Sequence, residues 1–443
     1  MADKSKGYIK MKGYLKKIIT LIVGASMILS TAGCGDKETS ESGDSIVSTE
    51  SGKKEMVLPE VSDFLSLTTW NDEMFDAYTR PFWYTREIYN ETLVFVGEEG
   101  VASLMYEPFE IDSVRSYDLL TNYVDGKDYI IEGRTIRRLK GSAIPYWEPE
   151  EYFLEKPNNS SVTITVNPNA IDEGLDIDTS IQRYLRYAEG TVFTSKQLAV
   201  TYRTNELYDG VLPQGQRDKL SAFLTKLEAG EDVNIMIYGP STGTGCNASG
   251  TNYGGNINPY MPAFFNIIVQ YIEKNYNVNV NLMNESVGGW KSSDLLANYN
   301  SKIKGKDIDL MLYICPGSND IATGKTSYVA NHHLLFQRFF ADYPEANLLV
   351  QMPLMANEQS TWIGPSAQMP SWVEEAIETC GSADRIAVSR INEIVEWMKT
   401  KGKRGRDFLA NNINHYNDFI LRVYVQCALK AMFGDDYATE NYE

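Results

Sequence analysis

Four short apolar runs recur in the second half of the chain, and a helical segment separates each from the next. The runs are Val233–Tyr238, Val278–Met283, Ile308–Cys315 and Ala346–Met352. Strands that alternate with helices form parallel sheets, because the crossover between parallel strands is usually a helix. Runs that are apolar almost throughout indicate that helices cover both faces of the sheet. We therefore expect a three-layer α/β domain over residues 218–443.

Residues 57–217 have a different rhythm. Runs of β-branched and aromatic residues are separated by turn formers, and they lie at Asn90–Val96, Tyr129–Ile131, Ser161–Val166 and Leu198–Tyr202. Gly126 and Gly133 supply tight-turn chemistry between such runs. Many short strands at this spacing favour an antiparallel arrangement. We expect an all-β, sandwich-like accessory domain.

The first 34 residues are typical of an export signal. The apolar run Ile18–Leu29 follows Lys10, Lys12, Lys16 and Lys17, and small residues then lead to Cys34. This order predicts a secretory signal that is too short for a lasting transmembrane helix. The ending Thr31-Ala32-Gly33-Cys34 resembles a bacterial lipoprotein cleavage box, which implies a lipid on Cys34 and an anchor at the extracellular face of the cell membrane. The alternative is secretion with an unmodified cysteine.

Composition constrains what lies beyond the anchor and which partners are suitable. Residues 35–56 contain almost no apolar side chain, so they cannot offset the entropy of ordering and should form a disordered tether. The formal net charge of −18 argues against nucleic acid as a partner, because phosphates would be repelled.

Three histidines, His332, His333 and His415, narrow the search for a general base. His332 and His333 are adjacent on an expected helix, Val329–Phe340, so their side chains point in different directions and at least one should be a surface or boundary residue. His415 lies in an Asn-rich loop before an apolar helix over residues 419–432. It is the better candidate for a base that faces an active site.

Polar residues follow three of the expected strands, at the sheet edge where ligands bind in such folds. Ser241 follows the first strand, Gly288 and Gly289 follow the second, and Asn319 follows the third. Ser, Gly, Asn and His, in this order and each at a strand end or loop, resemble the SGNH hydrolases, also called GDSL esterases. The resemblance covers residues 233–432.

The resemblance implies a flavodoxin-like sheet and a serine esterase in which Ser241 is the nucleophile and His415 the base. Gly289 and Asn319 would be oxyanion donors, through a backbone N–H and a side-chain amide. A serine at the turn after a strand would present its Oγ at a helix N-terminus, where the dipole favours negative charge. Taken alone, Ser241 would be interpreted as a helix N-cap.

The chain departs from the family pattern in three places. Pro240 stands where the family has aspartate before the serine, Asn412 stands where an aspartate commonly precedes the histidine, and Tyr416 replaces a frequent proline. Asp418 or Asp407 is therefore expected to orient His415, unless a backbone carbonyl or Asn412 leaves a Ser–His dyad. Asp418 is also a candidate helix cap.

Other motifs leave alternatives open. The segments Phe82–Thr85, Ser113–Ser116 and Gly126–Tyr129 resemble the N-terminal domain of some bacterial members. The aromatic stretch Thr79–Tyr84 is either a sugar-stacking platform or core packing. Four cysteines form two disulfides or remain buried thiols, and they are Cys246, Cys315, Cys380 and Cys427.

The expected function is hydrolysis of small esters, with O-acetyl groups of polysaccharides as the preferred substrate class. A lipid or lysophospholipid esterase is the nearest alternative, and a non-catalytic glycan-binding lipoprotein is the alternative from another class. Asp320 is expected to brace its loop. No metal-binding cluster, HExxH motif or phosphate loop occurs in the sequence, so no metal or nucleotide cofactor is expected.

Overall fold

The computed structural model describes residues 64–159 and 162–439, so Cys34, the signal and the tether lie outside the described residues. A five-stranded parallel sheet organises the C-terminal half. Its strands are β9 (Val233–Tyr238), β10 (Val280–Asn284), β11 (Leu310–Ile314), β12 (Asn347–Gln351) and β13 (Ile386–Ser389). Their spatial order is β10-β9-β11-β12-β13, which is the flavodoxin-like order. The expected fold class is confirmed, and β13 adds a strand that was not expected.

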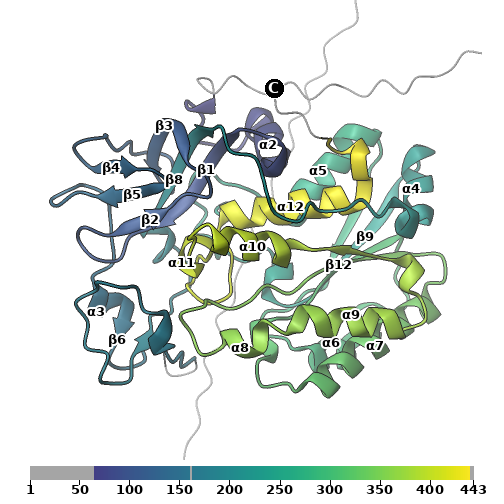
Figure 1. Ribbon diagram of the computed structural model, residues 1–443. Helices are drawn as coiled ribbons and strands as arrows, with labels where there is room; N and C mark the ends of the chain where they lie inside the picture. Colours follow the sequence, from purple (N-terminus) through teal and green to yellow (C-terminus); the bar gives the residue numbers. More distant parts are fainter. Residues whose placement is uncertain (1–63, 160–161, 440–443) are drawn as a thin grey trace, which may run out of the picture. The chain divides into compact units, whose positions relative to one another are not determined.

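Alternate residues of each strand enter two separate cores, because successive strand side chains point to opposite faces. Ile235 and Ile237 belong to one core, whereas Met236 and Tyr238 belong to the other. The helices of the first face are α4 (Ser221–Glu228), α5 (Phe264–Tyr276), α10 (Ile391–Thr400) and α12 (Asp418–Phe433). Those of the second are α6 (Ser292–Lys302), α7 (Lys325–Asp342) and α9 (Met369–Thr379). Figure 1 shows the resulting three layers.

Three small antiparallel sheets form the N-terminal β region, as expected. They are β1 (Glu87–Val94), β8 (Gln197–Thr204) and β3 (Pro108–Ser116); β2 (Val101–Ser103), β5 (Thr135–Arg138) and β4 (Tyr129–Glu132); and β6 (Phe153–Leu154) with β7 (Tyr184–Leu185). The expected strand Ser161–Val166 is wrong over its described part, residues 162–166, because Thr165 and Val166 form only isolated bridges there. The structure also contains four shorter helices, which are α2 (Asp72–Thr79), α3 (Pro149–Tyr152), α8 (Ile363–Ser366) and α11 (Gly405–Phe408).

The β region and the α/β region share one hydrophobic core. Leu93 and Val200 from the β sheet lie in the same cluster as Phe419 from α12. A buried ion pair also joins the two regions, since Lys403 Nζ lies 2.7 Å from a Glu91 carboxylate oxygen and both side chains are 0% exposed. The two regions are therefore held together by apolar and ionic contacts alike.

The aromatic stretch ahead of β1 is part of that core. Phe82, Trp83 and Tyr84 are buried, with Trp83 0% exposed. A sugar-stacking platform needs open ring faces, so that interpretation is wrong and core packing is correct.

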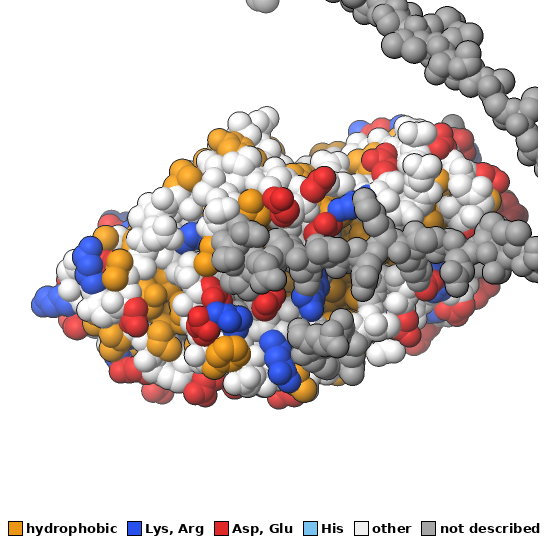
Figure 2. Space-filling view, turned by 90° about the horizontal axis from the view of Figure 1, so that it is seen from above, with side chains coloured by type: hydrophobic (Ala, Val, Ile, Leu, Met, Phe, Trp, Pro, Cys, Tyr) orange, Lys and Arg blue, Asp and Glu red, His pale blue; other side chains and the backbone are white. Residues whose placement is uncertain are grey.

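The state of the cysteines decides between the two alternatives left open by the sequence. The four cysteines of the described residues are buried free thiols, so the two-disulfide alternative is wrong. On the face shown in Figure 2, acidic side chains lie scattered among neutral and basic ones. Among the described residues, no helix combines the length and apolar character needed to cross a membrane.

Candidate active site

Ser241 lies just beyond the carboxyl end of β9, which pairs with β10 on one side and with β11 on the other. It begins a 3-10 helix of four residues, Ser241–Thr244, while the long helix α5 begins only at Phe264. Ser241 therefore begins a helix, as expected, but this helix is a short 3-10 turn. The N-cap interpretation is wrong, because Pro240 precedes the turn and the Ser241 hydroxyl contacts a histidine instead.

The partner of Ser241 is His415, whose Nε2 lies 2.8 Å from the serine Oγ. Its loop is fixed by one side chain: Asn411 Oδ1 accepts hydrogen bonds from the backbone N–H groups of Ile413, Asn414 and His415, each at 3.0 Å. The backbone N–H of Ala410 also donates to the His415 carbonyl, at 2.7 Å. The imidazole therefore sits on a loop whose backbone groups are already paired.

The other imidazole nitrogen faces Glu189, a residue that lies between β7 and β8 in the β region. His415 Nδ1 is 3.0 Å from Glu189 Oε2, while the Tyr187 hydroxyl and the Asn411 amide donate to Oε1 at 2.6 and 3.0 Å. Burial raises the pKa of Glu189, but His415 and these donors outweigh burial and lower the pKa to about 2. The carboxylate is ionised at neutral pH.

The structure corrects the expectation that Asp418 or Asp407 orients His415. Asp418 Oδ1 accepts the backbone N–H of Ser249 at 2.8 Å, and Asp407 accepts the N–H groups of Val94 and Arg404. Both carboxylates are buried in other surroundings, and neither contacts the imidazole. Asp418 does not cap α12 either, since that helix is capped by Asn417.

Asn412, which occupies the family's aspartate position, also points away from His415. Its Oδ1 accepts from the Tyr152 hydroxyl at 2.8 Å and the Asn357 amide at 2.9 Å, and its Nδ2 donates to the Arg186 carbonyl. Its backbone has φ of +71°, a left-handed conformation that asparagine tolerates better than most residues. Asn412 therefore fastens the histidine loop to the β region.

The two expected oxyanion donors lie in loops beside Ser241. Gly289 has φ of +80°, which favours glycine, and a Cβ added to its neighbour Gly288 would lie 3.8 Å from the Ser241 Cβ. Asn319 lines the same pocket as Ser241, and its Nδ2 donates to the Trp290 carbonyl at 2.9 Å. Their role as oxyanion donors stays a prediction.

Asp320 has the bracing role that was expected of it. Its carboxylate accepts from the backbone N–H and the hydroxyl of Ser292, at 2.8 and 2.9 Å, and from the Thr323 hydroxyl at 2.7 Å. These bonds tie the loop that carries Asn319 to the start of α6.

The remaining histidines lie on α7. His332 is 0% exposed, with Nδ1 2.8 Å from the Tyr328 carbonyl, and burial lowers its pKa to about 4. His333 Nδ1 lies 3.1 Å from the Thr379 hydroxyl oxygen. His332 is thus a core residue that contacts its own helix, whereas His333 contacts Thr379 of α9.

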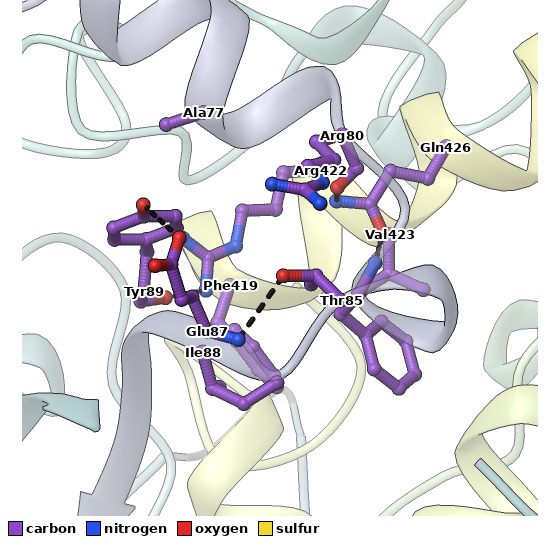
Figure 3. Close-up of a pocket in the computed structure, with 11 residues that line it drawn as sticks. Ala77, Arg80, Thr85, Glu87, Ile88, Tyr89, Phe419, Arg422, Val423 and Gln426 are labelled. Carbon is purple, nitrogen blue, oxygen red and sulfur yellow. Dashed lines mark hydrogen bonds between the residues drawn. The ribbon is translucent and has the colours of Figure 1, made fainter. Parts of the chain in front are cut away.

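No group of three or more His, Cys, Asp or Glu side chains is placed to hold a metal ion in residues 64–159 and 162–439. A second pocket lies between α2, β1 and α12, and Figure 3 shows that Glu87 there is paired internally with Tyr89. Neither Ser241 nor His415 lines that pocket.

Comparisons with known proteins show that part of this chain is similar in fold to several solved structures. No protein-family profile matches the sequence, and no curated protein is significantly similar to it. Among solved structures it is similar to a two-domain esterase active on acetylated mannans, co-crystallised with mannopentaose, at 15% identity and a TM-score of 0.41; the match covers 53% of this chain and 57% of that esterase. It is also similar to an acetyl xylan esterase from Geobacillus stearothermophilus, at 14% identity and a TM-score of 0.35, covering 47% and 96% of the two chains.

A third likeness is to a lipase/acylhydrolase from Enterococcus faecalis, at 17% identity and a TM-score of 0.33, covering 45% and 95% of the two chains. Values of this size do not say which substrate this chain uses. The case for its chemistry rests on the geometry around Ser241.

Proposed function

We propose that this chain is a serine esterase of the SGNH type that hydrolyses small acyl esters. The observation that carries the proposal is the contact of 2.8 Å between Ser241 Oγ and His415 Nε2 at the carboxyl edge of the parallel sheet. A serine hydroxyl becomes a nucleophile when a neighbouring imidazole accepts its proton.

The proposed reaction has two halves. Ser241 Oγ attacks the ester carbonyl while its proton moves to His415 Nε2, and the alcohol then leaves with that proton. A water molecule, activated by the same nitrogen, hydrolyses the acyl-enzyme and restores the serine. The backbone N–H groups of Ser241 and Gly289 and the amide of Asn319 would bind the oxyanion, and removal of one such donor typically costs about 3–4 kcal/mol of transition-state stabilisation.

O-acetyl groups on polysaccharides are the substrates that we propose. Among the described residues that line the pocket at Ser241, Leu354 is the only Leu, Ile, Val or Met, and the polar side chains include Thr242, Ser318 and Asn414. A lysophospholipid esterase would need a long apolar groove for the acyl chain, so this lining favours a short acyl group on a polar alcohol.

We also propose that Cys34 carries a lipid and anchors the protein to the extracellular face of the cell membrane. The basic segment, the apolar run and the small residues before Cys34 support this proposal. The change Cys34→Ala should release the protein into the soluble fraction, because it removes the site of lipid attachment. Unchanged retention in washed membranes would contradict the anchor.

The esterase is tested with protein that begins at Val57, by release of acetate from acetylated xylan and of nitrophenol from its acetate ester. Ser241→Ala and His415→Ala should each lower turnover by at least a hundredfold, and the double variant should lose little more because the two residues act as one unit. Ser371→Ala, on the exposed side of α9, is the matched control and should keep full activity.

An inactive wild type that also fails to react with a fluorophosphonate would contradict the esterase. The departure at Pro240 would then favour the glycan-binding alternative, in which the site has lost its chemistry.

A further inference from the structure

We infer that Glu189, a residue of the β region, is the positioning residue that holds His415 in its catalytic tautomer. The inference rests on the proposed esterase function and completes it. The three side chains lie in series, with Glu189 Oε2 3.0 Å from Nδ1 and Ser241 Oγ 2.8 Å from Nε2. This order of acid, imidazole and hydroxyl is the arrangement in which a serine loses its proton.

The chemistry follows from the charge on Glu189. An ionised carboxylate accepts a hydrogen bond, so Nδ1 must carry the proton and Nε2 must present its lone pair to the serine. When Nε2 takes up the serine proton, the imidazole becomes positive and the carboxylate stabilises that charge. Glu189 itself stays ionised at neutral pH, because its pKa is lowered to about 2.

The other titratable groups at Glu189 do not compete for this role. Burial raises the pKa of the Tyr187 hydroxyl, and burial raises the pKa of the Cys246 thiol to about 11. Both groups are therefore neutral at the pH of an esterase assay. Asn411, which also contacts Glu189, is an uncharged amide.

The segment around Glu189 is held against the α/β region from several sides. The Arg186 carbonyl accepts from Asn412 Nδ2 at 3.1 Å, and the Glu189 carboxylate accepts from the Asn411 amide at 3.0 Å, so both bonds reach the loop of His415. A Cβ added to Gly255 would lie 2.2 Å from the Thr191 Cγ2, so the Thr191 side chain packs directly against the Gly255 backbone. The β region thus supplies part of the active site.

This arrangement also accounts for asparagine at position 412. A carboxylate there could not reach the imidazole without breaking the bonds to Tyr152 and Asn357. The acid comes instead from a residue 226 positions upstream of His415.

The test compares Glu189→Gln with Glu173→Gln, a matched change at an exposed glutamate of the same region. Glu189→Gln should lower kcat by roughly 10²–10⁴-fold with KM nearly unchanged, because the amide can favour the wrong tautomer. The acid limb of the kcat/KM profile should move to lower pH, because the Glu189 carboxylate stabilises the positive imidazolium and a neutral amide does not. Glu173→Gln should match the wild type.

A purely structural role would lower thermal stability and leave that pH limb where it is. If Glu189→Gln does not fold, the wild type still decides the matter: its His415 Nδ1–H should give a far-downfield proton resonance that disappears in His415→Ala. Three histidines make the assignment simple.

The possible failures are distinguishable. If Ser241→Ala and His415→Ala are inactive while Glu189→Gln keeps wild-type turnover and pH profile, the inference about Glu189 is overturned and the esterase stands. If Ser241→Ala keeps full activity, the proposed function fails, and the inference about Glu189 fails with it.

Discussion

Asp418 should make the protein less stable as the pH rises from about 4 to about 6. Its carboxyl group is buried at the start of α12, and burial raises its pKa from 3.8 to about 6. The folded state therefore prefers the protonated form more strongly than the unfolded chain does. The stability contributed by this preference is complete below the unfolded pKa and is lost as the pH passes the folded pKa.

The magnitude follows from the size of the shift. A difference of about two pKa units corresponds to roughly 3 kcal/mol over the whole range, and about 1–1.5 kcal/mol of this should be lost between pH 5 and pH 7. Asp418→Asn keeps an oxygen that can accept the Ser249 N–H but cannot ionise. The variant should therefore gain about 1–1.5 kcal/mol relative to the wild type between pH 5 and pH 7.

Urea unfolding of both proteins at several pH values between 5 and 7 measures this difference. The comparison cancels the other titrating groups, because they are common to both proteins. The reasoning is refuted if the two stability curves run parallel, or if the wild type gains stability relative to Asp418→Asn as the pH rises.

Three further changes have defined outcomes. Asn412→Asp, which restores the family's aspartate, should lower stability by about 1–3 kcal/mol without raising turnover, because a carboxylate would face the Arg186 carbonyl with no proton to donate. Thermal unfolding measures the stability, and the ester assay measures the turnover. Lys403→Met should cost about 3–5 kcal/mol in urea unfolding because it leaves Glu91 buried and unpaired, and adding Glu91→Gln should recover part of that loss. His332→Leu should leave turnover unchanged and should reduce the loss of folding stability between pH 6.5 and pH 4. The buried imidazole of the wild type, with its pKa lowered to about 4, opposes protonation in the folded state, so the wild type loses stability as the pH falls. Urea unfolding of both proteins at pH 4.5 and pH 7 measures the difference.

The sequence predicts the elements whose signal is local. The strand Val233–Tyr238 is a continuous apolar run, and the structure has it with the same bounds. The strand β13 escaped notice because it is four residues long and mixes Ala387 and Ser389 with two aliphatic side chains. Short strands of this kind take their order from neighbours in the sheet, and no periodicity marks them.

The residues of the candidate site also differ in whether a local sequence signal marks them. Ser241, Asn319 and His415 each lie next to a strand or helix that the sequence marks, so their positions could be expected. Glu189 lies in an irregular stretch, Tyr187–Gly190, and nothing local ties it to a histidine more than two hundred residues away. The carboxylates near His415 in sequence, Asp418 and Asp407, bind backbone N–H groups elsewhere in the fold.

The span between Glu189 and His415 has a consequence for how the chain acquires activity. Ser241 and His415 both belong to the α/β region, but the carboxylate arrives only when the β region has docked and closed the shared core. A half-folded chain would hold a serine and an imidazole without the charge that makes the serine reactive. Hydrolysis would then begin only with the complete native state, so the rate at which activity appears during refolding would report the last docking step, without any need for an inhibitory segment.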